Sequence, residues 1–108
     1  MAARASALLQ PAESEPRGRF RIEGAVNFAT APELLALSET AFRDCTALEV
    51  DLGGVTHADS AALALLLLWM ERAQRAGASI HFRNAPEQLL GIARISDVES
   101  LLVRGLPA

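Results

Sequence analysis

The sequence predicts a single α/β domain, residues 1–108, in which helices cover a mixed β-sheet. Two stretches, Phe20–Val26 and Leu48–Leu52, alternate apolar with charged residues, as half-buried strands do. Ser60–Ala76 is a longer, strongly apolar stretch of helical length. After an initial hairpin, strands and helices alternate along the chain, which is typical of a sheet with parallel strands.

Two strands are expected before the first helix. We expect an edge strand at Ser6–Gln10 and a flexible loop over Pro11–Gly18. In the second strand, Gly24 and Asn27 are expected to break the alternating pattern. Its inward residues are Phe20, Ile22 and Val26.

The first helix is expected to begin after Thr30, a typical N-cap residue. Pro32 lies in the first turn, and Glu33 follows three residues after the cap, as in a capping box. The helix should end near Arg43. Its apolar side consists of Leu34, Leu35, Leu37, Ala41 and Phe42.

The central strand, Leu48–Leu52, is expected to end at Gly53-Gly54 in a tight loop. The long helix then covers Ser60–Ala76, and Gly77 is a suitable C-terminal cap.

In the last third of the chain, we expect a short strand at Ser79–Phe82. A helix should follow that begins at Pro86 and ends near Ile95. The inward residues of this helix are Leu89, Leu90, Ala93 and Ile95. The last apolar segment, Val98–Val103, is either a strand or a helical turn.

The helix Ser60–Ala76 has two apolar sides, although one is enough to pack on a core. At ~100° per residue, the core side holds Ala62, Leu63, Leu66, Trp69, Met70 and Ala73. A second patch falls among the charged residues of the other side and consists of Ala61, Ala64, Leu65 and Leu68. Either a neighbouring loop or the N-terminal segment covers this patch, or it is an interface for a protein partner.

Composition and charge exclude several classes of function. Apolar residues make up 51% of the chain and the net charge is −3, which speaks against disorder and against nucleic-acid binding. The single cysteine, Cys45, cannot form an internal disulfide or a multi-cysteine metal site. The longest apolar run, Ala61–Met70, is about half of a membrane span. We therefore expect a cytoplasmic protein without direct membrane insertion.

Asp59 and Ser60 lie at the start of the long helix, among free backbone N–H groups at the positive end of the helix dipole. This position suits a simple helix cap, and it also suits a phosphate or a polar group of a partner. His57 completes the residue types of a catalytic triad, but the three lie too close in sequence to converge from separate elements. With no phosphate-binding loop and no spaced metal ligands, we predict no cofactor, no metal and no enzymatic activity.

Two segments, in this order and spacing, resemble the STAS domain, the fold of bacterial anti-sigma factor antagonists and of sulfate-transporter tails. Residues 24–34, GAVNFATAPEL, are similar to the strand-to-helix segment of that family. Val50–Ser60 is similar to its central strand and DSSG loop. The resemblance covers Leu8–Leu106 and implies a single STAS-like domain.

Within this family, Ala61–Trp69 and Ile95–Leu102 are most similar to the small MlaB-type STAS subunit of the Mla phospholipid ABC transporter, also known as a toluene-tolerance protein. The resemblance implies a non-enzymatic subunit, peripheral to the inner membrane, that binds the cytoplasmic ATPase in a complex with permease and substrate-binding subunits. Such a subunit supports the assembly and activity of the transporter in outer-membrane lipid asymmetry. The residues expected to bind the partner are Asn27, His57, Asp59, Ser60, Ala61, Ala64, Leu65 and Leu68.

The alternative within the family is an anti-sigma factor antagonist that is switched by phosphorylation. Its phosphorylated hydroxyl would be that of Ser60. Ala62 stands where antagonists usually have the glycine of DSSG, and Asn27 stands where they usually have aspartate. These departures argue against a phosphorylation switch. They do not argue against docking, because the resemblance implies that Mla-type subunits use a hydroxyl at the Ser60 position in binding the ATPase.

Overall fold

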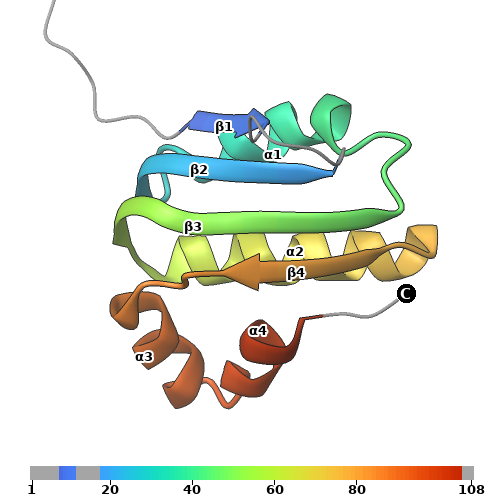
Figure 1. Ribbon diagram of the computed structural model, residues 1–108. Helices are drawn as coiled ribbons and strands as arrows, with labels where there is room; N and C mark the ends of the chain where they lie inside the picture. The colour runs from blue at the N-terminus through green and yellow to red at the C-terminus, as the bar shows by residue number, and fades with distance from the viewer. Residues whose placement is uncertain (1–7, 12–17, 106–108) are drawn as a thin grey trace, which may run out of the picture.

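The computed structural model describes residues 8–11 and 18–105, which form a four-stranded sheet and four helices (Figure 1). The strand order is β1-β2-β3-β4, with β1 antiparallel to β2 and the other pairs parallel. The predicted α/β class with a mixed sheet is therefore confirmed. The elements are β1 (Leu8–Pro11), β2 (Arg19–Val26), α1 (Ala31–Ala41), β3 (Ala47–Ala58), α2 (Ser60–Ala76), β4 (Ser79–Arg83), α3 (Glu87–Ile95) and α4 (Glu99–Arg104).

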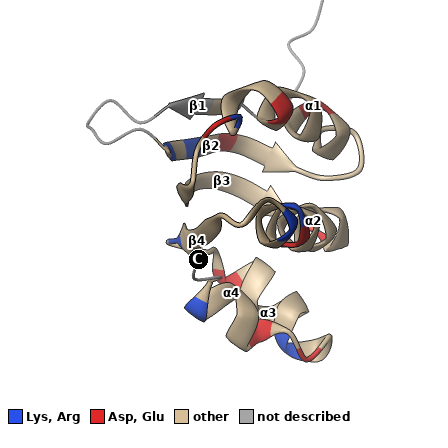
Figure 2. Cartoon of the chain, turned by 90° about the vertical axis from the view of Figure 1, so that its right-hand side faces the viewer, with Lys and Arg blue, Asp and Glu red and all other residues tan. Residues whose placement is uncertain are grey.

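The hydrophobic core lies between the sheet and the two longer helices, α1 and α2, which cover the same face of the sheet (Figure 2). Ile22, Val50 and Ile80 of the three parallel strands are almost completely buried there. Leu34 of α1 and Trp69 of α2 meet them from the helical side. Helix α4 packs against β4, and α3 contacts α2, β3 and α4. Both helices follow β4 at one side of the domain (Figure 1).

Helix α2 agrees closely with its prediction. It covers Ser60–Ala76 and ends at Gly77, which adopts the left-handed conformation of a C-cap. The residues of the predicted core side are all buried: Ala62, Leu63, Leu66, Trp69, Met70 and Ala73. The last apolar segment, for which strand and helical turn were both open, is the helix α4.

The predicted loop at Gly53-Gly54 is wrong, because β3 continues through both glycines to Ala58. Gly54 lies so close to β2 that a Cβ atom there would be 2.7 Å from the carbonyl oxygen of Ile22. Gly24 does not end β2 either, but lies within it at φ 102°, beside one of two register shifts against β3. These glycines permit close backbone approach and bulging within a strand pair.

Two apolar residues predicted to face the core are exposed. Leu37 is 46% exposed, because Ser38 takes the inward position next to it and bonds the indole of Trp69. Ile95, at the last turn of α3, is 88% exposed. The other predicted inward residues of these helices are buried or half-buried, and α1 ends at Ala41, ahead of the expected Arg43.

The predicted edge strand is present as β1, which pairs with β2 over Leu8–Pro11. The first residues of that prediction, Ser6 and Ala7, and most of the predicted loop, residues 12–17, lie outside the described part of the chain.

The face of the sheet opposite α1 and α2 carries charged side chains in cross-strand pairs. Glu49 of β3 lies 3.1 Å from Arg19 of β2 and 2.8 Å from Arg83 of β4. The hydrogen bond from Arg83 is the main cause that holds the pKa of Glu49 below its usual value, against the effect of partial burial. Partial burial acts to raise the pKa of Asp51. The hydrogen bonds that its carboxylate accepts, of which that from Asn84 is the strongest, outweigh this effect and lower the pKa below its usual value. This face therefore stays ionised and polar at neutral pH.

We predict that Gly54→Ala destabilises the domain by about 1–3 kcal/mol, because its methyl group must displace the β2 backbone. Gly91→Ala is the matched control, since a Cβ at that helical position meets no atom within 4 Å and should stabilise by up to ~1 kcal/mol. Urea unfolding followed by circular dichroism measures both. Equal stability of the two variants would contradict the close approach of β3 to β2.

Candidate functional site

Two strand-to-helix turns lie side by side at the carboxyl ends of β2 and β3. Val26 and Ala58 are register partners at these ends, and the N–H of Asp59 lies 3.4 Å from the carbonyl oxygen of Val26. Each strand passes directly into a helix, β2 into α1 through residues 27–30 and β3 into α2 through Asp59 alone. Asn27 and Ser60, which the sequence predicted to contact a partner, are thus brought to the same edge of the sheet.

Asn27 holds the β2–α1 turn in shape. Its side-chain Oδ1 accepts hydrogen bonds from the backbone N–H groups of Ala29 (2.9 Å) and Thr30 (3.1 Å). Thr30 occupies the predicted N-cap position but makes no side-chain cap bond to α1. Its hydroxyl instead donates to the carbonyl of Ala25 (2.8 Å) and accepts from the N–H of Asn27 (2.9 Å). The amide of Asn27 therefore has a structural role in this turn.

Asp59 caps α2, since its carboxylate accepts a hydrogen bond of 2.8 Å from the N–H of Ala61. Ser60, the first helical residue, is exposed, and within the described residues its hydroxyl has no hydrogen bond. His57 is exposed on β3 and has no hydrogen bond to Ser60. The end of β3 is tied to α3 as well, because the side chain of Gln88 accepts from the N–H of Ala58 at 3.1 Å.

An apolar groove of about 310 Å³ lies between the N-terminal halves of α1 and α2. We call it the α1–α2 groove. The α1 side of the groove is lined by Phe28, Ala31, Pro32 and Leu35. The α2 side is lined by the four residues of the predicted second patch, Ala61, Ala64, Leu65 and Leu68.

The second patch of α2 is only partly an exposed surface. Leu65 and Ala61 are 3% and 7% exposed, so neither offers an open surface. Leu65 belongs to the hydrophobic core beneath α2. Ala64 remains exposed and Leu68 half-buried, which leaves a groove whose floor is apolar.

The residues that α1 and its turn contribute to the groove were not predicted from the sequence. Phe28 is 76% exposed at the groove, an unusual position for a large aromatic side chain. The usable signal was an aromatic residue in a short turn of small and polar residues, outside any apolar periodicity. Pro32 and Leu35 carry no such signal, because only the packing of α1 against α2 places them together.

Within the described residues, no helix is long and apolar enough to cross a membrane. In the same part of the chain, His, Cys, Asp and Glu side chains do not gather into a group of three or more that could hold a metal ion.

Comparison with known proteins identifies relatives of this fold. A family model described as "Mlab, STAS domain" matches residues 9–104. A search of curated proteins gives no significant match. A solved structure described as the anti-sigma factor antagonist SpoIIAA in its unphosphorylated form is similar with a TM-score of 0.67 and 16% sequence identity. The alignment covers 87% of this chain and 83% of the other, and it shows a shared fold.

We predict that Asn27→Ala destabilises the domain by about 0.5–2 kcal/mol, the usual cost of a lost cap, because two backbone N–H groups lose their acceptor. Asn27→Asp keeps acceptor oxygens next to the start of α1 and should retain most of the stability. Thermal unfolding of the three proteins makes the comparison. If Asn27→Ala is as stable as the parent protein, the turn does not depend on this amide.

Proposed function

The chain belongs to the STAS domain family, and we propose that it is a non-enzymatic accessory subunit that docks on the cytoplasmic ATPase of an Mla-type phospholipid ABC transporter. In this proposal the α1–α2 groove receives an apolar segment of the ATPase, and the domain supports assembly and activity of the transporter at the inner membrane. STAS domains generally act by binding other proteins, and the matching family model carries the MlaB description.

The observation that carries the proposal is the exposed ring of Phe28 beside an apolar groove. Large aromatic side chains dominate the binding energy of protein interfaces when they meet a partner next to a well-packed pocket. Exposed apolar surface of this kind usually marks an interaction site. Ala61, which lines the groove, directly follows Ser60 in the sequence. The hydroxyl of Ser60 is therefore available for a polar contact with a partner beside the groove.

The same geometry supports docking over catalysis. Asp59 is engaged as the cap of α2, and Asn27 is engaged in the β2–α1 turn. Ser60 has no base within hydrogen-bonding contact among the described residues, although an activated serine nucleophile needs one. The free hydroxyl is therefore better suited to a contact with a partner.

A substitution can test the proposed interface only at a residue whose side chain is not part of the core. A charge at Leu65, 3% exposed, would enter the core and unfold the domain, so Leu65→Arg cannot separate binding from folding. Phe28 is exposed, and its substitution leaves the core intact. Ile95 of α3 is an equally exposed apolar residue outside the groove and provides the matched control.

We predict that Phe28→Ser weakens binding to the purified ATPase subunit by roughly thirtyfold, as the loss of an interface hot spot of about 2 kcal/mol would. Ile95→Ser should bind as the parent protein does. Calorimetric titration gives the affinities, and circular dichroism verifies that both variants are folded. Unchanged binding of folded Phe28→Ser would refute docking through the α1–α2 groove.

A second candidate function, a phosphorylation-switched anti-sigma factor antagonist, is favoured by one observation. The hydroxyl of Ser60 is exposed and free of hydrogen bonds within the described residues, so a kinase can reach it. Phosphate there would add about −1.5 to −2 charges next to the carboxylate of Asp59.

We predict that Ser60→Glu weakens ATPase binding at least tenfold, because it places a second negative charge beside Asp59 at the rim of the groove. Ser60→Ala should lose only a hydrogen bond, with an effect of about tenfold or less. The antagonist proposal predicts a different result. There an anti-sigma kinase binds the protein and phosphorylates it, Ser60→Ala accepts no phosphate, and the ATPase does not bind.

A further inference from the structure

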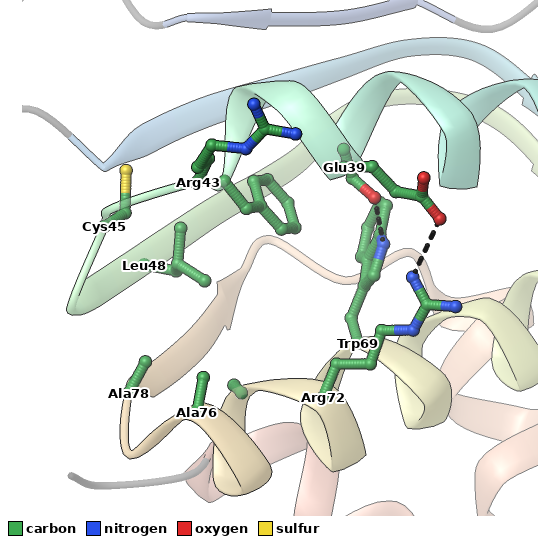
Figure 3. Close-up of a pocket in the computed structure, with 11 residues that line it drawn as sticks. Glu39, Arg43, Cys45, Leu48, Trp69, Arg72, Ala76 and Ala78 are labelled. Atoms are coloured by element: carbon green, nitrogen blue, oxygen red, sulfur yellow. Dashed lines mark hydrogen bonds and ion pairs between the residues drawn. The ribbon is translucent and has the colours of Figure 1, made fainter.

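A second hollow lies along the same pair of helices, between the C-terminal halves of α1 and α2 and the start of β3 (Figure 3). We call it the C-terminal cavity. Its volume is about 280 Å³, just below the range of about 300–1,000 Å³ found for small-molecule sites. The residues used below are Phe42, Arg43, Cys45, Trp69, Arg72 and Ala76, all of which line it.

The inner wall of the cavity is apolar and fixed in position. Trp69 is 2% exposed, and its indole N–H donates a hydrogen bond of 2.9 Å to the hydroxyl of Ser38. The ring of Phe42 packs edge-on against the indole, with ring centroids 5.1 Å apart. Since these contacts lock the rings, the cavity exists before a ligand arrives and needs little reorganisation to bind one.

Among the described residues, the lining of the cavity holds two arginines and one glutamate, and so carries a net positive charge. Arg72 lies 3.2 Å from Glu39, so these two charges neutralise each other. Arg43 also lines the cavity, and among the described residues it has no acidic partner. In Figure 3 the Arg43 side chain lies on the opposite side of the cavity from Ala76 and Ala78. An apolar interior, lined by one guanidinium that has no acidic partner in the described part of the chain, is complementary to a molecule with an apolar tail and one negative charge.

We propose that the C-terminal cavity binds a small amphiphilic monoanion, namely a medium-chain alkyl carboxylate. The alkyl chain packs against Trp69 and Phe42, and the carboxylate pairs with the guanidinium of Arg43. This site is separate from the α1–α2 groove, with which it shares no lining residue. The proposal therefore holds or fails independently of the ATPase as partner.

Octanoate is the probe for this site, and the protein contains two built-in reporters. Trp69 is the only tryptophan and Cys45 the only cysteine of the chain, and both line the cavity. We expect octanoate to change the fluorescence of Trp69 with saturation, at a Kd on the order of 1 mM for a ligand of about ten non-hydrogen atoms. Over the same concentration range, it should slow alkylation of the Cys45 thiol by iodoacetamide. Octanol, which has the same chain without the charge, should bind more weakly.

Two variants locate the site. Arg43→Gln should raise the Kd of octanoate roughly three- to fivefold, as expected for the loss of one solvent-exposed ion pair. Arg104→Gln is the matched control, since Arg104 is an exposed arginine on α4 outside the cavity. Ala76→Phe should abolish binding, because Ala76 is exposed at the cavity and a larger side chain there fills the space without entering the core.

The outcomes are distinct. Saturable fluorescence and thiol protection that Ala76→Phe removes and Arg43→Gln weakens support the proposal. Equal octanoate binding by folded Ala76→Phe would place the ligand elsewhere and overturn it. Absence of both signals in the parent protein at 10 mM octanoate, about ten times the expected Kd, would overturn it as well.

Discussion

The parallel pairing of β2 with β3 is the constraint on which the rest of the structure depends. β3 has twelve residues and follows β2 from Arg19 to Val26 through two register shifts, so that both strands end together. Each strand passes directly into a helix, and the helices α1 and α2 must then lie next to each other on the same face of the sheet. The close approach at Gly54 makes this pairing possible, because a side chain at that position would collide with β2.

The contact between α1 and α2 is tight in the middle and open at both ends. The hydrogen bond between Ser38 and Trp69 joins the helices at the centre, and the ion pair of Glu39 and Arg72 lies beside it. Towards either end the facing residues are often alanines, which are too short to fill the space between two helices. The α1–α2 groove is lined by Ala31, Ala61 and Ala64, and the C-terminal cavity by Ala73 and Ala76. Small residues at the ends of one helix pair thus produce both hollows.

Local sequence patterns predicted those parts of the fold that depend on periodicity. Helix α2 and its core side followed from spacing, because one helix that packs on a sheet must bury residues about 3.6 apart. The strands at Leu48–Leu52 and Ser79–Phe82 were also predicted correctly. At Leu48–Leu52 the signal was the alternation of apolar and charged residues, since successive side chains of a strand point to opposite faces. The Gly53-Gly54 pair was wrongly interpreted as a loop. Glycine occurs both in turns and in strands where two backbones approach closely, and the sequence alone does not distinguish the two cases.

The candidate site was predictable only in part. Its α2 side could be derived, since Ala61, Ala64, Leu65 and Leu68 stand out as surplus apolar residues on one helix. Its α1 side could not, because the packing of α1 decides how much of that patch remains exposed. Ser38 shows the same limit in the core. Because serine is polar, Ser38 was not predicted to face the core. Its burial is favourable because its hydroxyl accepts the hydrogen bond of the buried Trp69 indole N–H.

Side-chain hydrogen bonds hold both turns at the proposed docking edge. The side chains of Asn27 and Asp59 fix the two turns, and Gln88 attaches the end of β3 to α3. The surface next to Phe28 is thus held in shape before any partner binds. A preorganised surface loses little conformational entropy on association, so more of its contact energy appears as affinity. A phosphate on Ser60 would act on this edge through local charge, without refolding of the turns. In the proposed function, these turns hold the docking surface in place, and a phosphate on Ser60 changes its charge.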